Sequence, residues 1–515
     1  MRGALSLPAA LRHHAARTPD APAVAEPART WSFAALDAHT DVLAAGLAAS
    51  GLRPGDRVAL LAAPSATAIA LLAAAGRIGA CVAPLGTRLT LPELRAAAQE
   101  IAPRMVVHDA DLAAPAEELG IPAVGLEALA ARGAGFSIPA GATDEGAPAV
   151  AVLTSGTTGR PKAALLSHGA LAASAAAWAA ALPPATGWFL CLGLAHVAGL
   201  GVAWRSITAG VPLHLVPAFD AEVVLALLRD GPASHVSLVP TQLARLLDAE
   251  DAAVGTFATR DGEGASAGTR REGAHGALRA VLLGGAPIPP ALVMRALAAG
   301  WPVVPTYGLT EAASGVTALA TLDAAARPWS AGRPLPGVEV RIVTGPEDGP
   351  GDIEVRTPAA FSDYIGRPKA TTTAEAPDGW LRTGDTGRLD ADGYLEVLDR
   401  RDDLFVSGGE NVAPAEVEAA LERHPAVAEA GVVGRPDPTW GTVAAAALVL
   451  RPDASRPTDA ELRAFCLAQL APYKVPAVFR VVASLPRGES GKLQRRELRP
   501  CFAEMPATPA PRVPA

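Results

Sequence analysis

The segment TSGTTGRPK, residues 154–162, decides how the rest of this sequence is interpreted. It follows the apolar run APAVAVL, which is typical of a buried strand, and it precedes a run that looks helical. Its hydroxyls, two glycines and one lysine offer many hydrogen-bond donors to an anion within a short stretch of chain. The Walker spacing, GxxxxGK followed by Ser or Thr, is absent. The segment therefore predicts an anion-binding loop of another kind, although on its own it is also compatible with a flexible turn.

Around this segment, Ala-rich and Leu-rich helical stretches alternate with short apolar runs that end in Gly or Pro. ELRAAAQEI is a stretch of the first kind, and DRVALLAAP and ACVAPLG are runs of the second kind. Such alternation predicts α/β layers with mainly parallel sheets. In contrast, GRPLPGVEVRIV and GDIEVRT alternate β-branched and polar residues between turn signals. These two runs predict a small antiparallel sheet or β-barrel.

The pattern also divides the chain. After LDRRDD at 398–403, helix and strand signals start again. We therefore expect a large N-terminal domain over residues 1–401 and a small α+β domain over residues 402–504. The tail from 505 to 515 is rich in Pro and Ala and is expected to be disordered. Residues 249–277 show almost no apolar periodicity, which predicts a mobile surface loop.

Composition excludes several classes of protein. The chain has 515 residues, 50% of them hydrophobic, and a formal net charge of -8, so it lacks the basic excess that holds a nucleic acid. The four cysteines form no CxxC pair, which indicates reduced thiols and a cytoplasmic location. The N-terminus has no signal-peptide core. Residues 169–204 carry no Asp, Glu, Lys or Arg, but Pro183 and Pro184 interrupt them, so a membrane span is not expected. A homodimer is left open.

Further motifs follow in a fixed order: LLGGAPIP at 282–289, TYGLTE at 306–311, TGD at 383–385, LDRRDDLFVSGGENVAPAEVE at 398–418 and LPRGESGKLQRREL at 485–498. With TSGTTGRPK, they resemble the acyl-adenylate-forming superfamily, which includes acyl-CoA synthetases, adenylation domains of peptide synthetases and luciferases. The resemblance spans nearly the whole chain. It implies a large adenylate-forming domain of αβ layers with a small β-barrel, followed by a small mobile C-terminal domain.

The resemblance implies binding sites for ATP and Mg²⁺. Within the loop, Thr154, Ser155, Thr157 and Lys162 would hold the β- and γ-phosphates. Tyr307 would stack on adenine, Asp385 would accept hydrogen bonds from the ribose hydroxyls, and Arg400 would contact ribose and phosphate. Glu311 resembles the magnesium ligand, since a hard cation prefers carboxylate oxygen. The remaining residues implied at the nucleotide or the reacting centre are Gly156, Thr158, Gly159, Gly285, Ala286, Gly308 and Thr310.

The C-terminal motifs imply catalysis and motion. Lys492 matches the catalytic lysine, whose ammonium would stabilise the charge that shifts as a carboxylate attacks the α-phosphate. Asp402 resembles the hinge about which the small domain turns. Gly408 and Gly409 would border the path of coenzyme A, because glycine lets a thin ligand pass close to the backbone. Two positions depart from the usual pattern: Gly488 stands where threonine is usual, and Asp399 where glycine is usual.

The implied reaction has two steps, in which a carboxylic acid becomes an acyl-AMP and the acyl group then passes to coenzyme A. No Asp-Ser-Leu attachment sequence follows Lys492, so free coenzyme A is a simpler acceptor than a carrier protein. The strings at 86–94, 195–210 and 234–247 are similar to o-succinylbenzoate-CoA ligases of menaquinone biosynthesis. We therefore expect His196 and Arg205 to bind the substrate.

Arg205 is the informative residue, because a cation in an apolar pocket is costly unless it is paired. A second, aromatic carboxylate would pair with it in a two-pronged geometry. Arg205 could instead pair with a protein carboxylate, and Ala198 replaces a serine that is frequent in those ligases. Two alternatives stay open at this point: a general acyl- or aryl-CoA synthetase for monocarboxylic acids, and a catalytically silent relative that only binds nucleotide or a partner.

Overall fold

A computed structural model describes this chain at residues 5–87, 89, 91–135, 143–154, 162–216, 219–258, 276–343, 350–400, 405–407, 410–412, 414–437, 441–452, 454–470, 472–488 and 491–502. It divides into two compact units: Met1–Val340 with Val355–Leu381, and Arg341–Glu354 with Arg382–Ala515. The second unit thus begins before residue 402, since it includes strands on the N-terminal side of that position. The hinge at Asp402 lies outside the described residues and stays a prediction.

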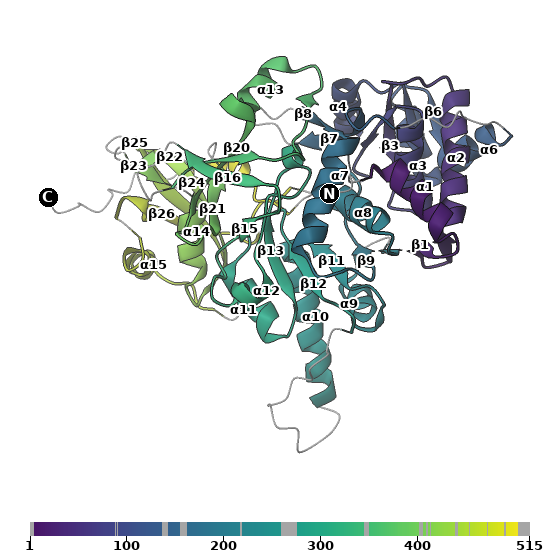
Figure 1. The fold of residues 1–515 in the computed structure, drawn as a ribbon. Coiled ribbons are helices and arrows are strands. Elements are labelled where there is room, and N and C mark those ends of the chain that lie inside the picture. The colour runs from purple at the N-terminus through teal and green to yellow at the C-terminus, as the bar shows by residue number, and fades with distance from the viewer. Residues whose placement is uncertain are drawn as a thin grey trace. The chain divides into compact units, whose positions relative to one another are not determined.

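The first unit contains a nine-stranded sheet whose centre is parallel, as the alternating pattern predicted (Figure 1). Antiparallel strands β2, β14 and β15 lie toward its two edges. In spatial order the strands are β15 (Arg333–Pro334), β14 (Thr317–Ala318), β13 (Val303–Tyr307), β12 (Ala280–Leu283), β11 (His235–Leu238), β9 (Trp188–Leu190), β10 (Leu213–Leu215), β1 (Pro22–Glu26) and β2 (Arg29–Ser32).

A seven-stranded sheet in the same unit carries the anion-binding segment. Its strands β7, β4, β3, β5 and β6 are parallel, while β8 and β18 are antiparallel additions at one edge. In spatial order they are β18 (Asp363–Tyr364), β8 (Lys162–Ser167), β7 (Pro148–Thr154), β4 (Cys81–Pro84), β3 (Arg57–Leu61), β5 (Met105–His108) and β6 (Ala123–Gly125).

Helices pack on these sheets and on one another, for example α7 on α8 and α2 on α3. The α-helices described in this unit are α1 (Leu7–Arg17), α2 (Phe33–Ala49), α3 (Ala66–Arg77), α4 (Leu91–Ile101), α5 (Ala113–Glu117), α6 (Leu126–Gly133), α7 (His168–Ala181), α8 (Val197–Ala209), α9 (Ala221–Asp230), α10 (Pro240–Ala258), α11 (Pro290–Ala298), α12 (Thr321–Ala324) and α13 (Pro368–Ala374). Within the described ranges, no helix is long and apolar enough to cross a membrane. The uncharged stretch 169–204 is divided among α7, β9 and α8.

The prediction of a loop over residues 249–277 was wrong for the first part of that range. Residues 249–258 were expected to be irregular, but they form the last part of α10. Tertiary contacts explain the difference, because Glu250 accepts hydrogen bonds from Arg229 at 3.1 Å and from the Trp301 indole at 2.8 Å. These contacts hold the helix beyond the point where its own sequence signal fades. The remainder of the predicted loop, residues 259–275, lies outside the described residues.

The predicted small barrel corresponds to an open five-stranded half-barrel sheet. In it, β19 (Glu375–Ala376) and β21 (Leu395–Arg400) both pair antiparallel with β20 (Trp380–Leu389). Its other strands are β16 (Glu339–Val343) and β17 (Gly351–Arg356).

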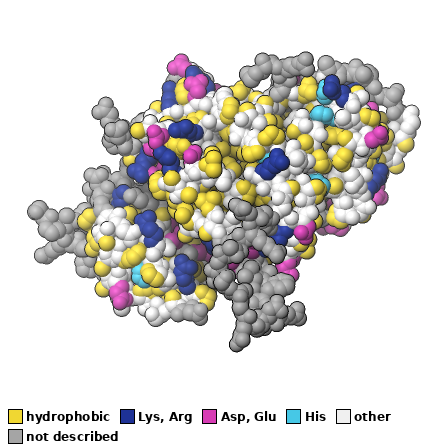
Figure 2. Space-filling view, turned by 60° about the horizontal axis from the view of Figure 1, so that its bottom comes forward, with side chains coloured by type: hydrophobic (Ala, Val, Ile, Leu, Met, Phe, Trp, Pro, Cys, Tyr) yellow, Lys and Arg dark blue, Asp and Glu magenta, His cyan; other side chains and the backbone are white. Residues whose placement is uncertain are grey.

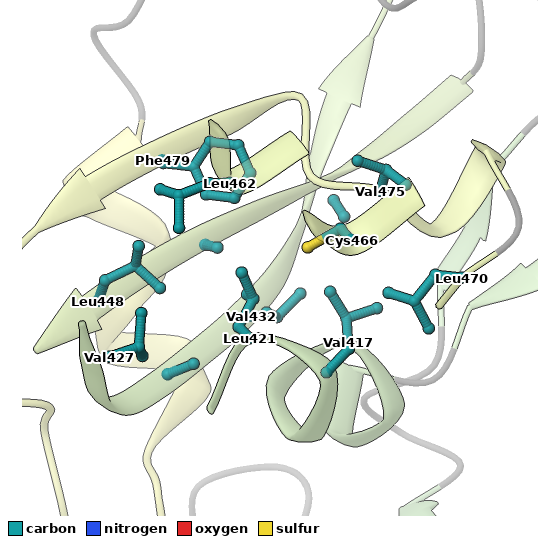
Figure 3. Close-up of a cluster of buried hydrophobic side chains, with 14 of the residues drawn as sticks. Val417, Leu421, Val427, Val432, Leu448, Leu462, Cys466, Leu470, Val475 and Phe479 are labelled. Atoms are coloured by element: carbon teal, nitrogen blue, oxygen red, sulfur yellow. The ribbon is translucent and has the colours of Figure 1, made fainter. Parts of the chain in front are cut away.

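The C-terminal part of the second unit is α+β, as expected. Val417 and Leu421 from α14, and Cys466 from α15, point into the same apolar cluster as Val432 and Leu448 of the sheet (Figure 3). Burying such side chains is the main stabilising contribution to a domain of this size. Its elements are β22 (Phe405–Ser407), β23 (Glu410–Val412), α14 (Pro414–Glu422), β24 (Val427–Asp437), β25 (Gly441–Leu450), α15 (Asp459–Leu467), β26 (Val478–Val481) and α16 (Arg495–Leu498).

The molecular surface carries both signs of charge. On the face shown in Figure 2, the described Lys and Arg side chains lie scattered among Asp, Glu and hydrophobic side chains. This mixture agrees with the small net charge of -8 for the whole chain.

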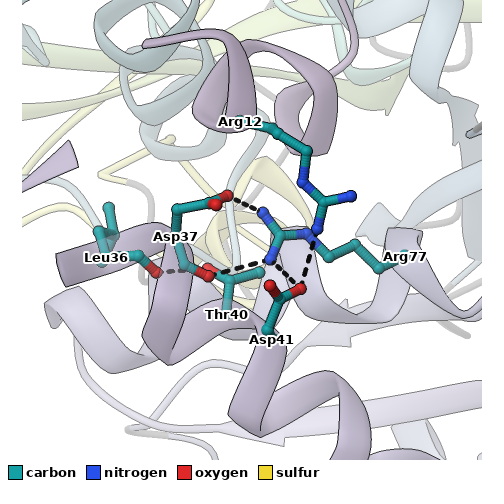
Figure 4. Close-up of polar contacts among 6 residues, drawn as sticks. All are labelled: Arg12, Leu36, Asp37, Thr40, Asp41 and Arg77. Atoms are coloured by element: carbon teal, nitrogen blue, oxygen red, sulfur yellow. Dashed lines mark hydrogen bonds and ion pairs between the residues drawn. The ribbon is translucent and has the colours of Figure 1, made fainter. Parts of the chain in front are cut away.

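An ion-pair network centred on the buried Arg77 side chain joins the first three helices (Figure 4). The Arg77 side chain is only 5% exposed; it pairs with Asp37 and donates to Asp41 Oδ1 at 2.6 Å. Arg12 donates to the same carboxylate at 2.9 Å, and Arg77 also donates to the Asp37 carbonyl at 3.0 Å. α1, α2 and α3 therefore share one polar contact point.

We expect Arg77→Met to lower the free energy of unfolding by about 3 kcal/mol, because it leaves Asp37 partly buried without its cation. Arg12→Ala is the matched control, since Arg12 and Asp41 are both more than 40% exposed and such pairs contribute less than about 1 kcal/mol. Urea unfolding followed by tryptophan fluorescence measures both. Equal losses in the two variants would contradict a stabilising role for burial of the network.

Candidate active site

The candidate site is built first from the carboxyl ends of the parallel strands in the nine-stranded sheet. β11, β12 and β13 end in register, with Leu238 opposite Leu283 and Leu283 opposite Pro305. In parallel α/β sheets, ligands bind beyond this edge. The Thr306 hydroxyl donates to the Leu283 carbonyl at 3.1 Å and so joins two of these strand ends. At this edge, Gly285 and Ala286 come shortly after β12, Tyr307 is the last residue of β13, and Gly308 follows it.

The turn after β13 is tightly built. At Gly308, a Cβ atom would lie 1.9 Å from the Ser314 carbonyl oxygen, so only glycine fits. Ala313 and Ser314 have φ values of 45° and 77°, which cost side-chain-bearing residues about 1–3 kcal/mol each and persist only where the surroundings impose them. Ser174 of α7 supplies part of that constraint by donating to the Ala313 carbonyl at 2.7 Å. This turn contains a single 3₁₀ turn, Thr310–Ala312, which carries Thr310 and Glu311.

The anion-binding segment connects two antiparallel strands. β7 ends at Thr154 and β8 begins at Lys162; the two residues are paired, and the Thr154 hydroxyl donates to the Lys162 carbonyl at 3.4 Å. The expectation of a helix directly after the loop was wrong, because β8 precedes α7. Ala and Leu fit a strand here because β8 pairs along its length with the buried β7. The loop itself, and with it Ser155, Gly156, Thr157, Thr158 and Gly159, lies outside the described residues.

Tyr364 joins the turn of Glu311 to the end of this segment. Its hydroxyl donates to Glu311 Oε1 at 2.6 Å, and its ring lies 5.3 Å from Lys162 Nζ. Two groups predicted to bind Mg²⁺ and phosphate therefore contact the same side chain. Tyr364 was not predicted as a site residue, because an aromatic residue shortly before a Gly-Arg-Pro turn carries no sequence signal of its own.

Glu311 fits a magnesium ion that is carried by a nucleotide. Over the described ranges, no group of three or more His, Cys, Asp or Glu side chains could hold a metal ion. Mg²⁺ is commonly held by one or two carboxylates together with substrate phosphates and water, rather than by a cage of protein ligands. A single carboxylate at the edge of the sheet matches that mode of binding.

In the half-barrel sheet, the two predicted ribose contacts lie directly opposite each other. Asp385 of β20 pairs with Arg400 of β21 in the antiparallel ladder. The two residues are therefore direct neighbours across the backbone ladder of this sheet. Asp385 is buried, at 7% exposure, and its backbone N–H donates to the Thr383 hydroxyl at 3.1 Å.

Lys492 lies near the C-terminal end of a tight turn in the second unit. The Gly488 N–H donates to the Lys492 carbonyl at 2.9 Å, and Arg487 donates to the Gly491 carbonyl at 2.8 Å. The Lys492 residue is exposed. These bonds join Arg487 and Gly488 to Gly491 and Lys492, although Gly488 replaces the usual threonine; residues 489 and 490 lie outside the described residues. Gly408 and Gly409 lie outside the described residues, so their role stays a prediction.

The two expected substrate residues lie on one helix. His196 is exposed immediately before α8, and Arg205 lies inside the helix, 5% exposed. Arg205 Nε donates to the Gly201 carbonyl at 2.9 Å, which folds the guanidinium back by one turn, about 6 Å toward the N-terminus of the helix. A Cβ at Gly201 would lie 2.7 Å from Arg205 Nη2, so the glycine makes room for the cation. Since α8 follows β9, its N-terminus lies at the same edge as Glu311.

Among the described residues, Arg205 has no carboxylate partner. Its Nη2 contacts the Ser314 hydroxyl at 3.5 Å, whereas Nη1 is buried without a described hydrogen-bond partner. The rings of Trp178 and Trp188 lie 5.2 and 5.0 Å from the guanidinium carbon. Burial lowers the pKa of Arg205 to about 9, so the group is still charged at pH 7. A buried cation in an aromatic setting is costly unless an anion joins it.

Neighbouring polar atoms are also left without described partners. They include Nε1 of Trp178 and Nε2 of His235, whose ring lies 4.8 Å from that of Trp188. Burial lowers the pKa of His235 to about 4, with a smaller contribution from the charge of Arg205, so this histidine is neutral at pH 7. The indole N–H can only donate a hydrogen bond. The Trp178 indole is therefore a second donor near Arg205 that has no described partner.

Comparisons with known proteins agree with this geometry. Residues 11–365 match the family model of the AMP-binding enzyme, and residues 416–492 match that of the AMP-binding enzyme C-terminal domain. The chain belongs to the AMP-binding enzyme family.

Relatives within the family differ in their substrates. A 2-succinylbenzoate–CoA ligase from Geobacillus kaustophilus is 38% identical over 96% of this chain and 98% of the relative. A fatty acid–[acyl-carrier-protein] ligase, ScoC from Streptomyces coeruleorubidus, is 34% identical over 95% of each chain. The o-succinylbenzoate CoA synthetase of Bacillus subtilis, 32% identical, was solved with its acyl-adenylate intermediate (TM-score 0.82, 95% and 97% coverage) and with ATP and magnesium (TM-score 0.81, 95% and 98% coverage).

Within the first unit of this AMP-binding enzyme, Tyr364 contacts both Glu311 and Lys162, and Thr154 pairs with Lys162. Arg205 contacts Ser314, in the turn that also carries Thr310 and Glu311, and His196 precedes the helix of Arg205. Gly285, Ala286, Tyr307 and Gly308 lie at the carboxyl ends of β12 and β13, and in the second unit Asp385 pairs with Arg400.

Proposed function

We propose that this protein is an ATP-dependent acid–CoA ligase that acts on o-succinylbenzoate in menaquinone biosynthesis. In the first step, one carboxylate oxygen of the acid attacks the α-phosphorus of ATP, and the bond to the β-phosphate oxygen breaks. Pyrophosphate leaves and the acyl-AMP remains. In the second step, the thiol of coenzyme A loses its proton and its sulfur attacks the acyl carbon, and AMP leaves with the bonding electron pair.

The chain's own residues supply binding and charge stabilisation. Lys162, at the end of the phosphate segment, would neutralise the phosphates that leave as pyrophosphate. A magnesium ion on Glu311 would add positive charge at the same phosphates. Tyr307 would hold adenine, and Asp385 would accept from the ribose hydroxyls, a role for which its buried carboxylate is suited. Lys492 would stabilise the charge that develops at the α-phosphate.

The observation that carries the choice of acid is Arg205. A site for a fatty acid gains nothing from a buried guanidinium for which the described residues supply no carboxylate, whereas a second carboxylate on the substrate compensates its charge. The guanidinium points toward the catalytic edge and touches Ser314, three residues after Glu311. We accordingly assign the aromatic carboxylate of o-succinylbenzoate to Arg205, and a substrate contact to His196, which is exposed just before the same helix.

A cytoplasmic location is part of this proposal. Two points support it. All four cysteines are free thiols, namely Cys81, Cys191, Cys466 and Cys501, and reduced thiols persist in the cytoplasm.

A panel of carboxylic acids tests the proposal. Pyrophosphate release and CoA thioester formation are measured with ATP, MgCl₂ and coenzyme A for o-succinylbenzoate, benzoate and decanoate. We expect o-succinylbenzoate to exceed the two monocarboxylic acids by ~100-fold or more in kcat/KM, because a site built to bind a charged group rejects analogues that lack it. A preference for decanoate or benzoate would favour a general acyl-CoA or aryl-CoA synthetase. Pyrophosphate release without a CoA thioester would point to another acceptor.

A further inference from the structure

Tyr364 contacts two parts of the nucleotide site that are distant in sequence. Glu311 and Tyr364 are 53 residues apart, yet the hydroxyl lies 2.6 Å from Glu311 Oε1. Tyr364 is 7% exposed, and its ring packs against Phe361 with centroids 4.7 Å apart. A short hydrogen bond from a neutral donor to an ionised carboxylate is stronger than one between neutral groups.

The same short segment also holds the backbone of Glu311. The Phe361 N–H donates to the Glu311 carbonyl at 2.8 Å. Both the main chain and the side chain of Glu311 are therefore bound by residues 361–364. Because the phenol occupies Oε1, the carboxylate cannot rotate freely, and Oε2 keeps its lone pairs for another partner.

This segment is anchored on the strand that leaves the phosphate loop. β18 pairs with β8, with Tyr364 opposite Ala164, and the Ile365 N–H donates to the Ala163 carbonyl at 3.0 Å. Lys162 begins β8, and its ammonium lies 5.3 Å from the centre of the Tyr364 ring. Tyr364 thus fixes Glu311 relative to the strand that carries Lys162.

We infer that Tyr364 is a positioning residue that orients the Glu311 carboxylate toward the magnesium ion bound with ATP. The inference rests on the proposed use of ATP and Mg²⁺. Partners that orient a metal-binding carboxylate typically contribute 10- to 100-fold to metal affinity. Loss of the hydroxyl should therefore weaken the part of ATP binding that depends on Mg²⁺ and leave the rest unchanged.

The test uses the full-length protein and an ATP analogue with a methylene bridge between the α- and β-phosphorus atoms, which cannot transfer its adenylyl group to an acid. The Kd of this analogue is measured by isothermal titration calorimetry, once in the presence of MgCl₂ and once in the presence of EDTA. For Tyr364→Phe we expect a Kd within about 2-fold of the wild type in EDTA, and a Kd about 10-fold weaker than the wild type with MgCl₂. Phe361→Leu is the matched control, because it removes ring packing on Tyr364 but keeps the hydroxyl, and it should retain the wild-type response to Mg²⁺.

A double-mutant cycle separates positioning from general structure. In the Glu311→Gln background, Tyr364→Phe should cause no further change in the response to Mg²⁺, since the carboxylate that the phenol orients is gone. The inference is overturned if Tyr364→Phe keeps the wild-type response, or if it weakens binding equally with and without Mg²⁺. If Mg²⁺ does not affect binding to the wild-type protein, the proposed use of Mg²⁺ itself fails, which is a different result.

Discussion

Lys492→Ala is expected to lower acyl-AMP formation by about 1,000-fold while leaving thioester formation from supplied acyl-AMP largely intact. Preorganised donors aimed at developing negative charge contribute about 100- to 1,000-fold each, and an ammonium group belongs at the upper end. The turn that presents Lys492 is held by backbone bonds through Gly488 and Gly491, so removal of the side chain should not disturb it.

The two half-reactions are measured separately. Exchange of labelled pyrophosphate into ATP reports adenylation, and mass spectrometry of the CoA thioester formed from synthetic acyl-AMP reports the second step. Arg496→Ala is the matched control, because Arg496 is another exposed cation of the same unit, on α16. Equal losses in both half-reactions of a folded Lys492→Ala variant would remove Lys492 from its adenylation role.

Arg205→Ala should weaken the use of o-succinylbenzoate by about 2–5 kcal/mol, as expected when one partner of a buried charge pair is removed. The loss should follow the charge of the substrate. Benzoate and short fatty acids lack the second carboxylate, so the substitution should affect them much less or should even make them react faster. The reason is that removing an unpaired buried cation also removes the cost of its desolvation. The affinity for ATP should hardly change.

This experiment compares kcat/KM for each acid in the wild type, Arg205→Ala and Arg205→Lys. Lysine keeps the charge but not the two-pronged geometry, so Arg205→Lys should be intermediate on o-succinylbenzoate. Ser314→Ala is a further control, since it removes the contact at 3.5 Å but leaves the cation. A uniform loss with every acid would show that Arg205 is a structural arginine that supports the Ser314 turn.

The sequence alone determined the family-level architecture, and its motifs predict most of the nucleotide site. Local periodicity identifies βα units because the burial of a strand or helix face leaves a repeat in adjacent residues. Ordered motifs such as TYGLTE and TGD then predict roles for Tyr307, Glu311 and Asp385, because each motif is a short, contiguous string. The parallel sheets, the half-barrel and the α+β character of the C-terminal domain were all predictable for these reasons.

Only the tertiary structure decided which distant residues meet. Tyr364 contacts Glu311 across 53 residues, and Arg205 contacts Ser314 across 109 residues. No local pattern encodes such contacts, because they depend on the order of strands in a sheet and on which helix faces are covered. The same reason explains why α10 continues to Ala258 and why a strand follows the phosphate loop. The sequence likewise shows Arg205 as a cation in an apolar helix. Only the packing of α7, α8 and β9 shows that no carboxylate among the described residues pairs with it.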